Sequence, residues 1–202
     1  MENVGFLTTA LIILVVGSCL AAGGNLLIDD FESVTDWLNG GGDANNATLS
    51  TDKIEGTYAL NFTVISDNSV STWGEIYKNT NLDLNNYSFL SFDIKTVSSQ
   101  QIKLHIYFKE SDGDRWCINT TDAFLTVPVD GWMHYNIPLT ELKSCWALGD
   151  GIQEWATINR IALNSELDDN ATYLVDNMTL HQDVLLATSS FEGQNYCIAL
   201  NP

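Results

Sequence analysis

The feature that most constrains the fold is a strict alternation of side-chain character between Ile102 and Lys109. Every second position from Ile102 to Phe108 is apolar, and the positions between them, from Lys103 to Lys109, are polar or aromatic. Because successive side chains of a β-strand point to opposite faces of a sheet, the pattern predicts a strand with one buried face and one polar face. The polar face is a surface on which a ligand can lie.

Short apolar or alternating runs follow one another from Asn25 onward, separated by clusters of Gly, Asn, Asp and Ser. Few segments show the periodicity of a helix, so the spacing predicts an all-β sandwich of two sheets. The predicted strands cover residues 26–31, 59–64, 74–77, 89–96, 102–109, 115–119, 134–138, 160–164 and 173–181. The glycine-rich segment 39–43 is predicted to be a loop.

A length of 202 residues suits one main domain rather than two. The formal net charge is −18, from 26 acidic and 8 basic residues. A field of this sign repels nucleic acid and anionic lipid headgroups, which excludes both as partners. The same charge is compatible with neutral glycans and with calcium ions.

The first 24 residues are typical of an export signal. An apolar run over residues 6–16 is followed by small residues up to Gly24, and the run is short for a membrane span. Cleavage near residues 22–24 is one interpretation. The other is a lipoprotein signal, in which Cys19 after Val-Gly-Ser is lipidated and anchors the chain. Either way we expect a secreted or cell-surface protein.

We expect the main domain to cover residues 25–183 and a tail to cover residues 184–202. The start of the tail, VLLATSSFEG, echoes the opening of the domain, NLLIDDFES. It is either the truncated start of a second repeat, with a neighbouring domain beyond the C-terminus, or an apolar tail that resembles one by chance.

Two further features are those of an exported chain. Cys117 and Cys145 are the two cysteines inside the body of the domain, and they form either a disulfide or two buried thiols. Six Asn-x-Ser/Thr sequons would make the chain a glycoprotein where such sites are used. They lie at Asn46, Asn61, Asn86, Asn119, Asn170 and Asn177.

Six segments occur in a recognisable order: 28–32 (IDDFE) before Trp37, 55–60 (EGTYAL), 73–76 (WGEI), 83–92 (DLNNYSFLSF), 131–139 (GWMHYNIPL) and 173–180 (YLVDNMTL). Together they resemble the jelly-roll carbohydrate-binding modules attached to polysaccharide-degrading enzymes, and more distantly the complex I intermediate-associated protein family. The resemblance covers residues 26–181. It implies a two-sheet antiparallel β-sandwich, a jelly roll of the galactose-binding-like type, that holds a polysaccharide or glycan without transforming it.

The resemblance also implies a structural calcium ion between the first and last strands of the domain. The residues at the matching positions are Glu32 and Asp176, with the backbone near Gly56, and Asp30 is an additional candidate ligand. Calcium prefers six to eight oxygen ligands, which carboxylates from two neighbouring strands can begin to supply. The alternative is that these carboxylates are solvated charges at a sheet edge.

A sugar site needs a flat aromatic ring for stacking and polar groups that hydrogen bond to hydroxyls. Strand parity places several such side chains on the outer face of the predicted sheets. Trp73 at a strand entrance and Trp146 in a predicted loop beside Cys145 can each form the wall of a groove. The candidates are Trp73, Glu75, Tyr77, Asp93, His105, Tyr107, Arg115, Trp146, Arg160 and Asn164.

No catalytic activity is expected from this sequence. It lacks a Gly-x-Ser-x-Gly elbow, a His-Glu-x-x-His motif and a phosphate-binding glycine loop. The alternative to a carbohydrate-binding module is a structural or adhesive cell-surface glycoprotein domain that packs against protein partners. An exposed strip of aromatic and polar side chains on one sheet favours the binding module over that alternative.

Overall fold

The computed structural model describes residues 24–42, 44–65, 73–97, 102–118, 125–127, 131–146, 148–166, 170–182, 186–191 and 194–199. The chain divides into a unit of residues Gly23–Asp183 and a second unit of Met1–Ala22 with Val184–Pro202. In the second unit, β14 (Leu186–Phe191) pairs with β15 (Gln194–Ala199) in an antiparallel hairpin. The predicted export signal and Cys19 lie outside the described residues, and the second repeat stays a prediction.

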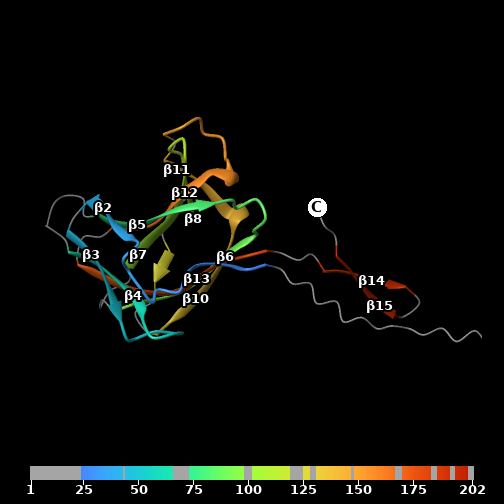
Figure 1. The fold of residues 1–202 in the computed structure, drawn as a ribbon, viewed down its shortest axis with the longest axis horizontal. Helices are drawn as coiled ribbons and strands as arrows, with labels where there is room; N and C mark the ends of the chain where they lie inside the picture. Colours follow the sequence, from blue (N-terminus) through green and yellow to red (C-terminus); the bar gives the residue numbers. More distant parts are fainter. Residues whose placement is uncertain are drawn as a thin grey trace, which may run out of the picture. The chain divides into compact units, whose positions relative to one another are not determined.

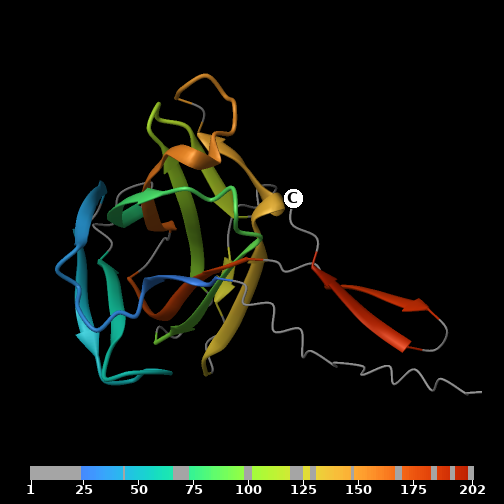
Figure 2. The ribbon, with the colours of Figure 1, turned by 45° about the vertical axis from the view of Figure 1, so that its right-hand side comes forward.

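The larger unit consists of two antiparallel sheets (Figures 1 and 2). Sheet A has the strand order β10 (Met133–Pro138), β6 (Phe89–Thr96), β13 (Ala171–His181), β4 (Ala59–Ile65) and β3 (Ala44–Ser50). The short strand β1 (Leu26–Asp29) pairs with residues 178–180 of β13. The pairing of β13 with β6 has a bulge between Asp176 and Thr179. Apart from the consecutive strands β3 and β4, neighbours in this order are distant in sequence, which is the topology expected of a jelly roll.

Sheet B has the strand order β11 (Leu142–Trp146), β8 (Arg115–Ile118), β7 (Ile102–Glu110), β12 (Ile158–Glu166), β5 (Trp73–Leu82) and β2 (Trp37–Gly42). A short strand, β9 (Leu125–Val127), also pairs with β7. The 3-10 helices η1 (Leu139–Glu141) and η2 (Trp155–Thr157) precede β11 and β12. The predicted two-sheet antiparallel β-sandwich is confirmed. Among the described residues, no helix is long and apolar enough to cross a membrane.

The core lies between the two sheets and is filled by the inward faces of their strands. In β7 the apolar positions of the alternating pattern, Leu104, Ile106 and Phe108, are fully buried in this core. Phe62 and Tyr173 from sheet A are also fully buried and stack with ring centroids 5.8 Å apart. Burying an aliphatic or aromatic side chain of this size contributes about 1.5–3 kcal/mol, so the interior between the sheets is the main source of stability.

The predicted loop at residues 39–43 is wrong, because β2 continues through the glycines to Gly42. A bulge between Asn39 and Gly41 interrupts its pairing with β5, and Gly41 and Gly42 have φ values of 117° and 83°. A Cβ atom on Gly42 would lie 2.1 Å from the backbone oxygen of Trp73. Glycine here permits a bulge and a close approach of two strands, whereas the sequence pattern treats it as a strand terminator.

Candidate functional site

The outward side chains of sheet B form a second cluster, separate from the core. We call this surface the outer face of sheet B, made of Trp73, Glu75, Tyr77, His105, Tyr107, Lys109, Arg115, Arg160, Ala162, Asn164 and Cys117. Its side chains lie in cross-strand rows. In one row Ala162 of β12 lies between Tyr77 of β5 and Tyr107 of β7, and in the next Asn164 lies between Glu75 and His105.

Glu75 is the polar centre of the outer face of sheet B. Its side chain is 4% exposed, and its Oε2 accepts a hydrogen bond of 3.4 Å from Asn164 Nδ2. Nη1 of Arg160 lies 3.8 Å from Oε1. Gly40 of β2 lies against the same carboxylate, because a Cβ atom there would be 2.4 Å from Oε1. A buried carboxylate held in this way orients the amide and the guanidinium beside it.

Both arginines of the sequence lie on the outer face of sheet B and contact tyrosine rings. The guanidinium carbon of Arg160 lies 3.7 Å from the ring centroid of Tyr77. That of Arg115 lies 5.1 Å from the ring centroid of Tyr107. Both distances fit a cation–π interaction. In a chain with a net charge of −18, this concentration of arginine gives the face a local charge unlike that of the rest of the surface.

Tyr107 and His105 lie on the predicted face but are more buried than strand parity indicates. Tyr107 is fully buried and His105 is 4% exposed. Burial, and next the neighbouring Glu75 carboxylate, raise the pKa of Tyr107 well above its ordinary value. Burial also lowers the pKa of Lys109, and the charges of Arg160 and Arg115 add to this shift. Tyr107 is therefore a neutral, buried ring beneath the Arg115 guanidinium rather than an exposed stacking surface.

Trp73 is the exposed aromatic residue at the rim of this face. It begins β5, shares the parity of Glu75 and Tyr77, and is 37% exposed. Gly41 and Gly42 lie against its indole, which leaves no side chain of β2 between the ring and solvent at these two positions. An exposed flat ring beside a polar network is the combination that sugar stacking requires.

The predicted disulfide is present at the β8 end of the face. Cys117 and Cys145 are bonded, with an S–S distance of 2.03 Å, and join β8 to the edge strand β11. The backbone of Trp146 pairs with Arg115 of β8, and its side chain lies outside the described part of the structure. The structure thus places Trp146 at this end of sheet B by its backbone alone.

Asp93 is the one candidate that the structure places on the other sheet. It belongs to β6 in sheet A, is 8% exposed, and its Oδ1 lies 3.1 Å from Nδ1 of His134. Asp93 is separated from the others because β6 pairs within sheet A. Outward-facing residues of the two sheets point to opposite sides of a sandwich. Asp93 therefore does not join the other candidates.

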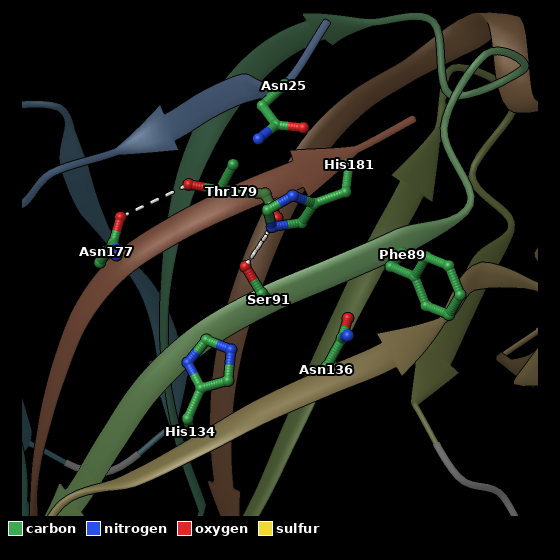
Figure 3. A pocket seen from close by; sticks show the side chains of 8 residues that line it. All are labelled: Asn25, Phe89, Ser91, His134, Asn136, Asn177, Thr179 and His181. Carbon is green, nitrogen blue, oxygen red and sulfur yellow. Dashed lines mark hydrogen bonds between the residues drawn. The ribbon is translucent and has the colours of Figure 1, made fainter. Parts of the chain in front are cut away.

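The outer face of sheet A has a hollow of its own (Figure 3), and His134, the partner of Asp93, is one of its lining residues. Its volume is about 500 Å³. Ser91 of β6 and His181 of β13 meet in it, with Oγ and Nε2 2.6 Å apart, and Phe89 is its aromatic residue. The remaining lining residues are Asn25, Asn136, Asn177 and Thr179. The hollow is polar and was not predicted from the sequence, because its lining comes from β6, β10, β13 and the residue before β1.

The residues expected to hold calcium also come together. Asp30, Glu32 and Asp176 line a pocket of about 290 Å³, together with Leu27, Glu55, Gly56 and Asn177. Asp176 is 1% exposed, and its Oδ2 accepts hydrogen bonds from the backbone N–H groups of Ile54 and Glu55 at 2.8 and 3.0 Å. Its Oδ1 is buried without a hydrogen-bond partner among the described residues. Such an oxygen, next to other carboxylates, suits a cation.

Glu32 is held on the other side of this pocket. Its Oε1 accepts hydrogen bonds from the backbone N–H groups of Thr57 and Tyr58, at 2.5 and 3.1 Å. These two bonds lower the pKa of Glu32, which keeps its carboxylate charged. Gly56 has a φ of 61°, and a Cβ atom there would lie 2.0 Å from Oε1. The glycine turn thus admits the carboxylate.

The two-sheet jelly roll is the fold of β-sandwich carbohydrate-binding modules, and the polar and aromatic outer face of sheet B is compatible with that class. The sequence matches the family model "Carbohydrate binding domain 30" over residues 27–182, and the chain belongs to that family. The predicted resemblance and the prediction of a non-catalytic domain are confirmed, because the family is one of carbohydrate-binding domains. A comparison with curated proteins finds no match.

Solved structures of related modules share the fold. The family 11 carbohydrate-binding module of the cellulosomal cellulase Lic26A-Cel5E of Clostridium thermocellum has a TM-score of 0.63 and 20% identity, over 81% of this chain and 97% of that one. A family 11 module from the same organism in complex with a β-1,3-1,4-mixed-linked tetrasaccharide has a TM-score of 0.62 and 21% identity, over 79% of this chain and 96% of that one. An exo-β-agarase has a TM-score of 0.60 and 14% identity, over 78% of this chain and 25% of that one. At these identities the likeness is one of fold.

Proposed function

We propose that the domain binds a polysaccharide on the outer face of sheet B, with Trp73, Glu75, Tyr77, Arg160 and Asn164 as its contact residues. The observation that carries the proposal is the contact network in which Arg160 lies over Tyr77 and faces the Glu75 carboxylate. The network comes from two adjacent strands, β5 and β12, so its geometry is fixed by the sheet.

A sugar supplies what this network lacks. Its hydroxyl groups lie in pairs that can donate to a carboxylate and accept from a guanidinium or amide at once, and these charged hydrogen bonds are the strong ones. Its C–H face is weakly polar and packs on an aromatic ring, for which Trp73 is exposed. The contact residues are supported by neighbours on the adjacent strands β7 and β8, namely His105, Tyr107 and Arg115.

We further propose that Asp30, Glu32 and Asp176 hold a structural calcium ion. The buried, unpartnered Oδ1 of Asp176 and the charged carboxylate of Glu32 supply hard oxygen ligands, which fit this ion. The ion would supply positive charge where the acidic residues that follow β1 meet those of β13 and the glycine turn. The backbone N–H groups of residues 54–58 orient the carboxylates of Asp176 and Glu32.

The domain acts outside the cell in this proposal, as a secreted or surface-bound protein. The apolar N-terminal run and the Cys117–Cys145 disulfide support an oxidising compartment. Lipidation of Cys19 and a neighbouring domain beyond residue 202 stay predictions. So does N-glycosylation. The structural or adhesive alternative gains no specific support from the described surface and becomes an outcome of the binding test.

The test is a binding screen of the full chain against mixed-linked β-glucan, xylan and agar, by affinity electrophoresis and calorimetry. We expect saturable binding to at least one polymer and a loss of about 10-fold or more in the Trp73→Ala variant. Trp132→Ala is the matched control, because Trp132 is a partly exposed tryptophan beside sheet A whose Nε1 donates to Asp52. Absence of binding by the folded wild-type chain to every polymer would leave the adhesive role in its place.

A further inference from the structure

Three acidic side chains meet at the turn between β7 and β8, away from both sites described above. Glu110, Asp112 and Asp114 each offer a carboxylate oxygen, and these oxygens all lie within 4.8 Å of one another. Glu110 and Asp114 are fully buried, while Asp112 is exposed. In both ribbon views this turn lies beside the loop that precedes β12, at one end of sheet B (Figures 1 and 2).

Backbone amides of that loop hold the three carboxylates in place. Asp114 accepts hydrogen bonds from the N–H groups of Gly149 and Gly151, at 2.7 and 2.5 Å. Asp112 Oδ2 accepts from the N–H of Asp150 at 3.2 Å, and Glu110 Oε1 accepts from the N–H of Glu154. The acidic residues are therefore held close to one another by backbone amides of a distant loop, and within the turn Asp112 Oδ1 accepts a hydrogen bond from the N–H of Asp114 at 3.1 Å.

One carboxylate oxygen of Glu110 has no hydrogen bond of normal geometry among the described residues. Its Oε2 is buried and makes no hydrogen bond within the part of the chain that the structure describes. Within that part, no lysine, arginine or histidine forms an ion pair with Glu110, Asp112 or Asp114. The indole of Trp116 also lies beside the Glu110 carboxylate. Like charges at this separation in a desolvated place are costly without a counter-charge.

We propose that Glu110, Asp112 and Asp114 bind a divalent cation of the calcium type, at a site separate from the Asp30–Glu32–Asp176 pocket. Calcium accepts hard oxygen ligands in flexible geometry and completes its six to eight ligands with waters or backbone carbonyls. The residues stand at every second position, and Gly113 between two of them has a φ of 115°, which lets the chain turn around an ion. Arg115 follows this turn directly, so the cation fixes the strand from which its guanidinium reaches Tyr107.

The test reads the metal directly and does not depend on glycan binding. Terbium binds calcium sites and emits when a nearby tryptophan is excited. Trp116 follows the cluster in sequence and packs against Trp155, with their ring centroids 6.1 Å apart. We would titrate terbium into the full chain carrying Asp176→Asn, which removes the other pocket. We expect saturable emission that calcium displaces, and a fall in terbium affinity of about 10-fold or more when Asp112→Asn is added.

Asp112 is exposed, so Asp112→Asn should leave the fold intact, and near-ultraviolet circular dichroism checks this. Asp83→Asn is the matched control, because Asp83 is an exposed turn aspartate that caps the N–H of Asn85 far from any acidic cluster. Calorimetry with calcium should show one ion fewer per chain in Asp112→Asn than in the wild type. The proposal would be overturned by the absence of saturable emission in the Asp176→Asn chain, or by unchanged emission when Asp112→Asn is added to it. The acidic cluster would then serve only to hold the loop at residues 149–154.

Discussion

Arg160 lies over the ring of Tyr77, with its guanidinium carbon 3.7 Å from the ring centroid. The two residues come from paired strands, and Glu75, two residues before Tyr77, faces the same guanidinium at 3.8 Å. A long arginine side chain loses much conformational freedom on binding a ligand, but here a ring and a carboxylate already restrict it. The contact therefore prepares the outer face of sheet B for a polar ligand.

Replacing Arg160 with alanine should weaken polysaccharide binding. A hydrogen bond to a charged group contributes about 1.5–3 kcal/mol, so we expect a loss of roughly 10- to 150-fold in affinity, measured by calorimetry with the polymer that the wild type binds. His134→Ala, on the outer face of sheet A, should leave the affinity unchanged. The reverse pattern would move the binding site to the hollow of Figure 3.

Gly40→Ala should disturb the same network through Glu75. The added Cβ atom would lie 2.4 Å from Oε1 of a buried carboxylate, which has no room to move away. We expect a destabilisation of about 1–3 kcal/mol in urea unfolding, with weaker polysaccharide binding. Gly24→Ala serves as the control, since its Cβ atom would be 3.5 Å from the nearest atom. Equal stability of both variants would show that Glu75 is not confined as described.

The Glu32 carboxylate should make stability depend on pH in the acidic range. Its pKa is lowered below the ordinary value of 4.5 by the N–H groups of Thr57 and Tyr58. A lowered pKa means that the stabilisation is complete above pH 4.5 and is lost as the pH falls through the folded-state value. With chelator present, Glu32→Gln should be less stable than the wild type near neutral pH, and the difference should shrink on acidification. A difference that is constant with pH would refute this.

Removing the disulfide should lower stability without changing the fold. The bridge joins cysteines 28 residues apart, and closure of a loop of this size contributes about 3–4 kcal/mol by its effect on the unfolded chain. We expect a loss of this order in urea unfolding of the Cys117→Ser, Cys145→Ser double variant. The wild type unfolded in reducing buffer should match the variant. A stable variant with wild-type unfolding would mean that the two thiols are not bonded in solution.

Calcium should stabilise the domain through the pocket between β1 and β13. Ligand binding to the folded state alone raises stability by about 2.7 kcal/mol at a concentration one hundred times the dissociation constant. We expect chelator to lower the melting temperature of Asp112→Asn, in which this pocket is intact. Chelator should have less effect on Asp176→Asn, where the buried ligand oxygen loses its charge. An identical response in the two variants would place the stabilising ion elsewhere.

Part of the site was predictable because β-strand parity is a local property. Glu75, Tyr77, Arg160 and Asn164 alternate with apolar neighbours, and the structure places all four on one face. Asp93 shows the same alternation but belongs to sheet A, which parity within one strand cannot reveal. Which strands become neighbours depends on contacts between residues far apart in sequence.

The acidic cluster at the β7–β8 turn could have been predicted from its sequence pattern. Three carboxylates at every second position around a glycine, in ESDGD, are uncommon enough to indicate a metal site. Their importance, however, rests on burial. Glu110 and Asp114 are buried because the loop at residues 149–154 covers them, and that loop lies more than thirty positions later in the chain.

The sequence by itself determined the class of fold, the strands with one apolar face and the two cysteines available for a disulfide inside the domain. These follow from alternation, spacing and residue type, each of which acts locally or through a simple count. The carboxylates between the first and last strands were expected from the family resemblance instead. The tertiary structure alone decided that Tyr107 is fully buried beneath Arg115, and that glycines 40–42 form a strand against Glu75 and Trp73. The reason is physical: the exposure of a side chain is set by whatever packs over it, and in a sandwich with crossing connections those residues come from distant parts of the chain.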